Sequence, residues 1–394
     1  MKKNALKSLR VRNLLSFGED SPEIELGDLN VLIGPNGSGK SNLIEIIGLL
    51  RSTPKDFADE VGSSGGISEL LWKGWKGRAN SQIASLQVIA NPKEIKRPLR
   101  YSLSFTRVGP QLEIVDERIE NENPDQGHER PYLYFDYNGG RPMLNLGGKQ
   151  RSLRHEEVDF QKSILSQRQD PEQYPEVTYL GRLFSSFRLY RNWDFGPDSE
   201  VRDLYGSERK NDYLEEDISN LGLMLNRLRA DSRAKSDLLQ YLKMFYQGAE
   251  DVLTPIQGGL VDVRVEEENG ITIPATRLSD GTLRWLSLLT ILLHPEPPPL
   301  ICIEEPELGL HPDMIRPLAK LMLSASERMQ LVVTTHSDSL VDELSGTPGA
   351  VIVCEKNDGS TSLRHLDIEE LSDWMKRYTL GQLWRTGELG GNRW

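Results

Sequence analysis

Eight residues near the start of the chain, Gly34–Ser41, have the types and spacing of a phosphate-binding loop. They match the pattern G-x-x-x-x-G-K-[ST] and follow the apolar run 29–33, which predicts a strand. Glycines at 34, 37 and 39 let backbone N–H groups curl around phosphates where a Cβ would obstruct them. Lys40 would reach the β- and γ-phosphates, and the Ser41 hydroxyl would ligate Mg²⁺. The residues predicted to surround the nucleotide are Gly34, Pro35, Asn36, Gly37, Ser38, Gly39, Lys40, Ser41 and Asn42.

Two carboxylates end the apolar run 300–303. Ligands bind at the carboxyl ends of strands in open α/β sheets, so Glu304 and Glu305 are placed for chemistry there. Glu304 would hold Mg²⁺ through its water shell, and Glu305 would polarise an attacking water. The alternative is a pair of solvated loop acids. Their position directly after an apolar strand favours the catalytic interpretation.

His336, in Thr-Thr-His-Ser at 334–337, also follows an apolar strand. It could hydrogen-bond the γ-phosphate or the attacking water. A lone His at a strand end is more often structural, and only the order of the motifs favours a role in catalysis.

A fourth motif, Leu278-Ser279-Asp280-Gly281-Thr282, opens a predicted helix. Ser279 and Gly281 offer a hydroxyl, backbone N–H groups and a dipole end to an anion. One nucleotide cannot easily use two helix N-termini of the same chain on opposite sides of its γ-phosphate. A second copy of the chain is the economical solution.

The elements that must position these residues follow from hydrophobic patterning. We expect strands at 6–11, 24–26, 29–33, 82–90 and 100–108, with a helix at about 42–51. Residues 52–80 are expected to form loops, and 120–150 carry little periodic signal. A helical pair is expected over 211–247, broken at 229–233. From 271 onward the pattern predicts alternating helices (280–293, 313–328) and strands (300–304, 331–335, 350–355), typical of a parallel sheet.

Composition excludes several classes of protein. The 394 residues are 37% hydrophobic and 27% charged, with a net charge of −12 that argues against an extensive DNA-binding surface. The two cysteines, Cys302 and Cys354, lie in apolar runs and are expected to be buried thiols in a reducing cytoplasm. No apolar run approaches the length of a membrane span, and the N-terminus lacks a signal-peptide core.

Taken together, the four motifs resemble the head domain of ABC-type ATPases. More narrowly, they resemble the RecF/SMC-like branch, which includes the ATPase part of overcoming-lysogenization-defect nucleases. Asn13–Gly18 and Glu304–Pro312 are similar to segments of that branch, and the closing 380–391 is similar to that of stand-alone bacterial ATPases. The resemblance covers roughly 1–110 and 270–394.

The resemblance implies an α/β P-loop NTPase fold: a two-lobed ABC-ATPase-like head with a mixed sheet and an inserted helical region. It also implies that two heads sandwich two ATP molecules with Mg²⁺. Lys40, Ser41, Glu304, Glu305 and His336 would then come from one subunit, and Ser279, Asp280 and Gly281 from the other. ATP binding would close the homodimer and hydrolysis would open it.

Three features depart from the family pattern. Glu304 stands where Asp is usual, and Asp280 places a carboxylate near the partner's nucleotide. The Mg²⁺-sensing Gln is not clearly placed, with Gln82 and Gln87 as candidates.

The spacing of the motifs predicts three regions. These are an N-terminal lobe at 1–115, an insertion at 116–265 with the helical pair, and a C-terminal lobe at 266–394. Only 58 residues follow His336, too few for an appended nuclease domain, so no intrinsic nuclease activity is expected.

Residues 72–107, called the basic stretch here, could bind nucleic acid. The stretch has one acid, Glu94, and two tryptophans near its start, Trp72 and Trp75. Its eight cations are Lys73, Lys76, Arg78, Lys93, Lys96, Arg97, Arg100 and Arg107. Such a patch could track a phosphate backbone and stack on bases. A solvated outer face with two core tryptophans is the alternative.

Three functions remain open on the sequence. The first is an ATP-driven dimer switch acting on DNA in repair or anti-phage defence. The second is an ATP-gated scaffold that regulates a separately encoded effector without binding DNA. A membrane-transporter ATPase fits poorly with the long insertion. Assemblies larger than a dimer also remain open.

Overall fold

A computed structural model describes residues 4–74, 83–146 and 149–391 and divides them between two units. Unit 1 holds the described residues within 1–187, 348–377 and 383–394. Unit 2 holds 188–347 and 378–382. The phosphate loop therefore belongs to unit 1. The carboxylates, His336 and the Ser279 motif belong to unit 2.

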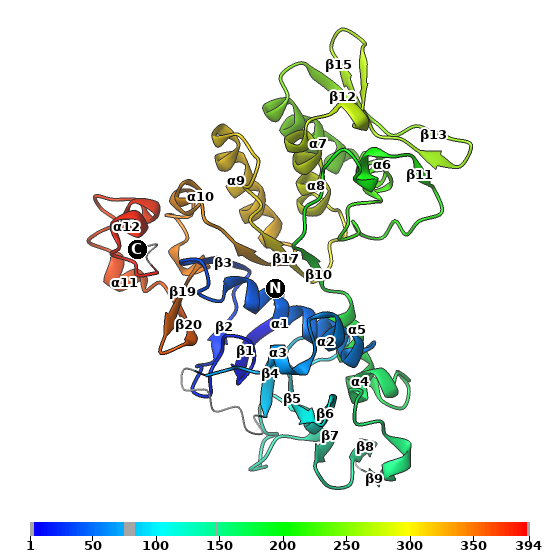
Figure 1. Cartoon of the computed structure of the whole chain (residues 1–394), viewed down its shortest axis with the longest axis vertical. Helices are drawn as coiled ribbons and strands as arrows, with labels where there is room; N and C mark the ends of the chain where they lie inside the picture. Colours follow the sequence, from blue (N-terminus) through cyan, green and yellow to red (C-terminus); the bar gives the residue numbers. More distant parts are fainter. Residues whose placement is uncertain (1–3, 75–82, 147–148, 392–394) are drawn as a thin grey trace. The chain divides into compact units, whose positions relative to one another are not determined.

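An eight-stranded antiparallel sheet forms much of unit 1 (Figure 1). In β5, buried and half-buried side chains alternate from 99 to 106, which is the pattern of a sheet packed on one face. In sheet order, its strands are β2 (Ile24–Glu25), β1 (Leu6–Arg12), β4 (Ala84–Ala90), β5 (Leu99–Val108), β6 (Gln111–Asn121), β7 (Leu133–Asn138), β8 (Met143–Leu146) and β9 (Lys149–Ser152).

A second group of strands in unit 1 carries the phosphate loop. β3 (Leu29–Ile33) is buried along its whole length, as expected of a parallel strand covered on both faces. It pairs in parallel with β19 (Val351–Asn357), which pairs in antiparallel fashion with β20 (Ser360–His365). The group is thus mixed, as predicted. Cys354 lies buried in β19, and Cys302 is buried in unit 2.

Helix α1 (Lys40–Ser52) follows the loop directly and buries most of its surface. It lies beside α2 and α5 in Figure 1. The other helical elements of unit 1 are α2 (Phe57–Ser63), α3 (Ile67–Leu70), η1 (His155–Glu157), α4 (Ile164–Gln167), α5 (Pro175–Ser185), η5 (Pro348–Ala350) and α11 (Ile368–Leu371). Helix α12 (Leu380–Thr386) belongs partly to each unit.

Three parallel strands of unit 2 position the carboxylate and histidine motifs. β10 (Arg188–Tyr190) pairs with β17 (Leu300–Glu304), and β17 pairs with β18 (Gln330–Thr334) in a register that sets Glu304 opposite Thr334. Both carboxylate and histidine motifs therefore leave the same edge of these strands. The accompanying helices are α8 (Asp280–Leu292), η4 (Pro312–Met314), α9 (Ile315–Ser326) and α10 (Asp338–Glu343).

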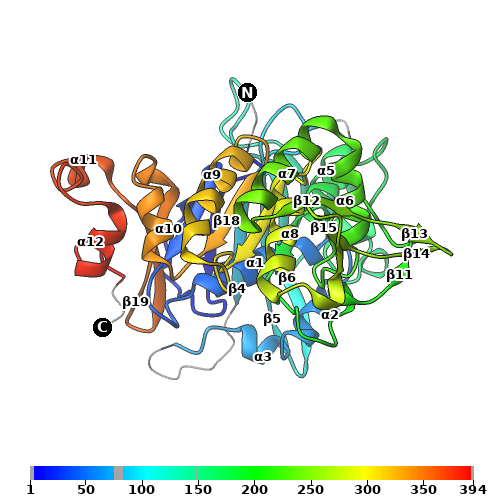
Figure 2. The ribbon, with the colours of Figure 1, turned by 90° about the horizontal axis from the view of Figure 1, so that it is seen from above.

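The rest of unit 2 contains the predicted helical pair and two small antiparallel sheets. Helices α6 (Leu221–Ala230) and α7 (Ser232–Phe245) pack with α8 (Figure 2). Because α8 is apolar over most of its surface, its burial from Thr282 to Leu292 is expected. One small sheet has the strand order β11 (Tyr205–Gly206), β14 (Leu260–Val261), β13 (Ile256–Gln257). The other has the order β12 (Ala249–Leu253), β15 (Arg264–Glu267), β16 (Thr272–Pro274). Unit 2 also contains the short helices η2 (Glu200–Arg202) and η3 (Ala275–Arg277).

Two expectations about elements were wrong, and a third stretch, for which no element was predicted, forms strands. Helices α2 and α3 lie in the stretch expected to be loops, where Asp56 caps α2 by accepting from the Asp59 N–H. Residues 120–150, without periodic signal, contribute to four strands, β6 to β9, of the antiparallel sheet. Residues 211–220, expected to be helical, are not. There the Asn220 side chain binds the backbone of Lys210, Tyr213 and Glu215 and holds the chain in turns.

The predicted boundary between 115 and 116 falls inside β6, since the antiparallel sheet continues to Ser152. Within the described part of the chain, no helix is long and apolar enough to cross a membrane.

Candidate nucleotide and catalytic sites

The phosphate loop runs from the end of β3 into α1 with its backbone tightly enclosed. Gly34 has φ 146°, and an added Cβ there would stand 2.2 Å from the Cys354 carbonyl oxygen. Gly39 has φ 104° at the N-terminus of α1, and its Cβ would stand 2.2 Å from Thr361 Oγ1. Only glycine fits at either position, so the sequence requirement follows directly from close approach.

Lys40 and Ser41 open α1 with different surroundings. Lys40 is buried, and its ammonium donates to the carbonyl oxygens of Gly34 and Pro35 at 2.8 and 2.9 Å. Ser41, Asn36 and Gly37 are exposed. The lysine charge is thus folded over the loop itself, within reach of any anion that the loop encloses.

A polar network that the sequence did not reveal holds the loop from behind. Thr361 Oγ1 donates to the Ser38 carbonyl at 2.8 Å and lies 2.7 Å from Ser16 Oγ. Asn42 Nδ2 donates to the same Ser16 Oγ at 2.7 Å. Ser16 lies in the stretch that carried the family resemblance, whereas Thr361 comes from β20. No local sequence pattern indicates Thr361, because it lies more than 300 positions from Ser38 along the chain and reaches it only in the folded structure.

The loop fits a nucleotide phosphate. The Ser38 hydroxyl is buried and has no hydrogen-bond partner among the residues that the structure describes, and the loop ends at the positive N-terminus of a helix. A buried orphan hydroxyl is costly unless a ligand satisfies it. With the lysine and an exposed serine hydroxyl beside it, this donor set suits ATP with Mg²⁺.

Glu304 is held by side chains from the neighbouring strand. Its carboxylate accepts from Arg191 Nε at 3.1 Å, and its carbonyl accepts from Trp193 Nε1 at 3.1 Å. Both partners follow β10. The predicted Mg²⁺ ligand therefore has a cationic neighbour that the sequence did not indicate, and Arg191 competes with a metal for this carboxylate.

Glu305 adopts a strained backbone. Its φ is 45°, a conformation that non-glycine residues rarely adopt and that clusters at functional sites. Its N–H donates to the Thr334 carbonyl at 3.0 Å, and its carbonyl accepts from Arg284 Nη2 at 2.6 Å. Arg284, on α8, lies buried over the Trp193 ring, and burial lowers its pKa to about 10. The Glu305 backbone is thus held on both sides, and the Glu305 side chain is 40% exposed.

His336 lies beside the Glu305 carboxylate. Its Nε2 stands 3.5 Å from Glu305 Oε1, and its N–H donates to Glu307 Oε1 at 3.1 Å. Glu307 also accepts from Thr335 Oγ1 at 2.6 Å, and burial raises the pKa of Glu307. The structure thus brings together Glu305 and His336, and adds Glu307 as the residue that holds the histidine segment.

Ser279 caps α8, accepting from the Thr282 N–H at 3.1 Å. Asp280 is exposed but pairs with Arg202 Nη2 at 2.5 Å. Arg202 also donates to the carbonyls of Ala275 and Leu278, both at 2.8 Å. This arginine, which the sequence did not indicate, shapes the turn before α8 and neutralises the carboxylate at its N-terminus. Asp280 therefore does not present an uncompensated charge.

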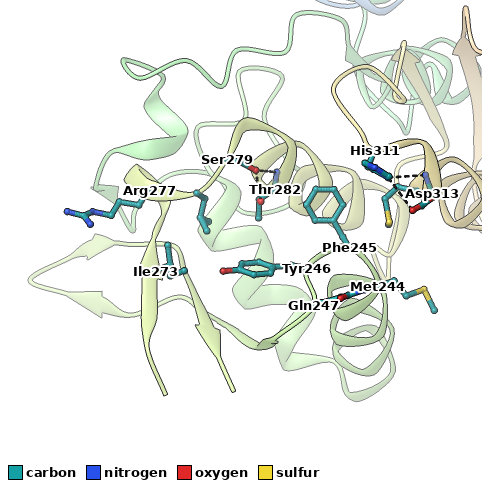
Figure 3. Close-up of a pocket in the computed structure, with 12 residues that line it drawn as sticks. Met244, Phe245, Tyr246, Gln247, Ile273, Arg277, Ser279, Thr282, His311 and Asp313 are labelled. Atoms are coloured by element: carbon teal, nitrogen blue, oxygen red, sulfur yellow. Dashed lines mark hydrogen bonds and ion pairs between the residues drawn. The ribbon is translucent and has the colours of Figure 1, made fainter. Parts of the chain in front are cut away.

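A cavity of about 510 Å³ opens beside this helix N-terminus (Figure 3). Ser279 and Thr282 line it from one side, and Phe245 and Tyr246, at the end of α7, line it from another. Gly281 approaches the chain closely, since a Cβ there would stand 3.1 Å from the Gly309 carbonyl. The motif thus lies at the rim of a space with room for part of a second molecule.

Two predicted features receive less support from geometry. Gln87 donates to Ser102 Oγ at 3.2 Å within the antiparallel sheet, while Gln82 lies outside the described residues. In the basic stretch, Trp75, Lys76 and Arg78 also lie outside them. Three cations that the structure describes pair with acids, Lys73 with Glu69, Arg97 with Asp125 and Arg100 with Glu120.

Comparison with known proteins gives a family match over residues 29–342, to the family described as AAA domain, putative AbiEii toxin, Type IV TA system. A stretch of 124 residues is 32% identical to the arginine transport ATP-binding protein ArtP of Haemophilus influenzae. It covers 29% of this chain and 43% of that protein, so the chain spans less than half of that relative.

Solved structures of SMC heads share the fold. The SMC head bound to the C-winged helix domain of ScpA has a TM-score of 0.55 at 15% identity, covering 93% of this chain and 99% of that one. The Smc head with an extended coiled coil, bound to the C-terminal domain of ScpA and derived from Pyrococcus furiosus, has a TM-score of 0.55 at 12% identity, covering 95% and 99%. At such identities the likeness shows the fold alone, and it confirms the expected ABC-ATPase-like head.

Proposed function

We propose that this chain is an ATP-driven homodimer switch. It belongs to the family described as AAA domain, putative AbiEii toxin, Type IV TA system, and it is an ABC-type ATPase of the RecF/SMC-like kind. The enclosed glycine loop with its orphan Ser38 hydroxyl is the observation that carries the proposal. Two heads would enclose two nucleotides, each held by the loop of one copy and the Ser279 motif of the other.

Each residue then has a definite task. Lys40 would leave the carbonyls of its own loop for the β- and γ-phosphates, Ser41 would hold Mg²⁺ directly, and Glu304 would hold it through its water shell. Bound Mg²⁺·ATP supplies the transferable phosphoryl group and neutralises its charge. Glu305 accepts the proton of the attacking water, and His336 orients that water or the γ-phosphate.

The partner copy contributes the N-terminus of α8. Ser279 supplies a hydroxyl, and the first N–H groups of the helix face the phosphate with the positive dipole end. Arg202 keeps the Asp280 carboxylate paired, so the approaching γ-phosphate meets a neutralised surface. The cavity beside Ser279 gives the incoming nucleotide room.

The direct test is the assembly state of Glu305→Gln with ATP. Loss of the general base should leave binding intact and trap the closed dimer, so light scattering should give twice the monomer mass with ATP and the monomer mass without it. Lys40→Ala is the control, because it should stay monomeric under both conditions. A Glu305→Gln chain that stays monomeric at saturating ATP, with ATP bound, contradicts the switch.

For the output of the switch, action on DNA in repair or anti-phage defence is one candidate. It depends on cations at 73–107. Charge reversal at Lys73, Lys76 and Arg78 should lower DNA affinity and flatten its dependence on salt. Unchanged affinity and salt slope would rule this face out.

Regulation of a separately encoded effector protein is the second candidate, and the paired cations favour it. Lys73, Arg97 and Arg100 each have an acidic partner, so fewer charges remain for a phosphate backbone. Both SMC heads compared above were solved with a bound ScpA domain. ATP turnover that is Glu305-dependent and indifferent to DNA would support this candidate, and DNA-stimulated turnover would contradict it.

A further inference from the structure

Residues near the end of the described chain pack against its phosphate loop. Residues 383–391, called the C-terminal segment here, belong to unit 1 with the loop and with β19. A Cβ at Gly391 would stand 3.3 Å from the Gly34 Cα and 3.0 Å from Val353 Cγ1. Gly391 is itself buried, so its backbone packs directly against the first residue of the phosphate loop.

Hydrogen bonds fix the C-terminal segment in this place. The Gly391 N–H donates to Glu355 Oε1 at 2.8 Å, and the Gly391 carbonyl accepts from Trp384 Nε1 at 3.1 Å. Arg364, on β20, donates to the Leu389 carbonyl at 3.0 Å. Leu383 and Leu389 are buried. The segment is thus attached to β19 and β20, the two strands that also contact the loop.

The same stretch of β19 touches the loop and the C-terminal segment. The Cys354 carbonyl oxygen would stand 2.2 Å from a Cβ of Gly34 and 3.7 Å from a Cβ of Gly391. A methyl group at Gly34 would therefore clash with this backbone, and one at Gly391 would be tight against the Gly34 Cα, so that one of them must shift by a few tenths of an ångström. A Cβ at Gly390 would stand 2.5 Å from Glu355 Oε1, the oxygen that the Gly391 N–H binds.

We infer that Gly390 and Gly391 are positioning residues for nucleotide binding, which hold Gly34 in the conformation that encloses the phosphates. Their role is to leave room and to supply backbone contacts, so they do not touch the nucleotide. The inference rests on the proposed function, because it assigns the C-terminal segment to the same ATP site.

The test compares two glycines with the same positive φ. Gly391 and Gly109 both have φ 62°, but an added Cβ at Gly109 meets no described atom within 4 Å. Gly391→Ala and Gly109→Ala therefore place alanine at the same unfavourable φ, and only the first pushes on the loop. Gly391→Ala should weaken binding of a fluorescent ATP analogue about tenfold and raise KM with kcat nearly unchanged, whereas Gly109→Ala should bind as wild type.

A second pair keeps the inference testable where Gly391→Ala fails to fold. Glu355→Ala removes the acceptor of the Gly391 N–H, and Glu355→Gln retains an oxygen that can accept it. Weaker ATP binding in Glu355→Ala, rescued in Glu355→Gln, supports the positioning role. Equal binding in the two variants overturns it.

The outcomes separate this inference from the proposed function. If wild type and Gly391→Ala bind ATP equally, the positioning role is overturned and the ATP site stands. If wild type binds no ATP, and Lys40→Ala changes nothing, both are overturned.

Discussion

The phosphate loop of unit 1 and the carboxylate edge of unit 2 are built by different means. The loop is enclosed by backbone and small polar groups, such as the Cys354 carbonyl, Thr361 and Ser16. The carboxylate edge, where Glu304 and Glu305 end β17, is held by arginines, with Arg191 on Glu304 and Arg284 on the Glu305 carbonyl; in the same unit Arg202 pairs with Asp280 at the start of α8. A site that binds a fixed anion can be rigid, whereas residues that change charge or partner need neighbours that balance charge.

The largest effect should come from the one strained carboxylate at that edge. Glu305→Gln removes the base that accepts a proton from the attacking water, so kcat should fall about 10²- to 10⁴-fold while ATP affinity is retained. Steady-state phosphate release and nucleotide binding on the same preparation measure both. Retained turnover would mean that the strain at Glu305, φ 45°, serves another purpose.

At the loop, steric exclusion should dominate. Gly34→Ala places a Cβ 2.2 Å from the Cys354 carbonyl, which the β3–β19 ladder fixes, so ATP affinity should fall more than about 100-fold. Gly127→Ala is the control, since its φ is also positive and its Cβ meets nothing. Isothermal titration with ATP compares them. Near-equal affinities would show that the loop moves more easily than its packing implies.

The buried acid of unit 1 sharpens the comparison through pH. Three neutral groups donate to the Glu117 carboxylate: Tyr101 Oη at 2.8 Å, Ser163 Oγ, and the Ile164 N–H at 2.9 Å. Burial raises its pKa to about 7 from 4.5, so the folded chain holds a proton that the unfolded chain loses.

Stability should therefore fall by up to about 3 kcal/mol as pH rises from 4.5 to 7, and level off above that range. Glu117→Gln should remove this slope. Thermal unfolding of both proteins across that range measures it, and parallel slopes would contradict the assignment.

A smaller effect should follow from the arginine that neutralises Asp280. Arg202→Ala frees a carboxylate at the N-terminus of α8, so ATP-dependent dimerisation should weaken about tenfold. Adding Asp280→Asn should recover part of it. Arg209→Ala, which removes an exposed pair with Glu200 and a contact with the Tyr205 ring but leaves the Asp280 pair intact, should have little effect on dimerisation. Sedimentation with ATP measures the dimerisation of each variant. If the double variant dimerises as weakly as Arg202→Ala, the Asp280 charge is not what weakens the dimer.

Sequence and structure agree best where the physics is local. The phosphate loop needs glycines at fixed offsets, and the buried strands β3, β17 and β18 are continuous apolar runs, so both were predicted. Residues 211–220 were wrongly expected to be helical because Leu214 and Ile218 recur at helical spacing. Ile218 instead has φ 64°, and Asn220 binds the backbone of Lys210 and Tyr213. A short strand such as β8 has little hydrophobic pattern of its own. It is specified by pairing with its neighbouring strands, which the local sequence does not show.

The arginines could not be predicted. Arg191 and Arg202 stand 113 and 78 positions from the carboxylates they hold, and no local pattern links them. Thr361 and Gly391 likewise reach the loop only through the fold of unit 1. Motifs therefore indicated which residues would do chemistry, and tertiary structure was needed to find those that position them.

The most direct measurement of the central claim mixes two inactive variants. Lys40→Ala removes the loop lysine, and Ser279→Arg blocks the helix N-terminus that would face the partner's nucleotide. If the two motifs act across a dimer, the mixed dimer retains one intact composite site, and ATP turnover should reappear on mixing. If both act on one nucleotide within one chain, each copy stays defective, and a mixture as inactive as its components would contradict the account.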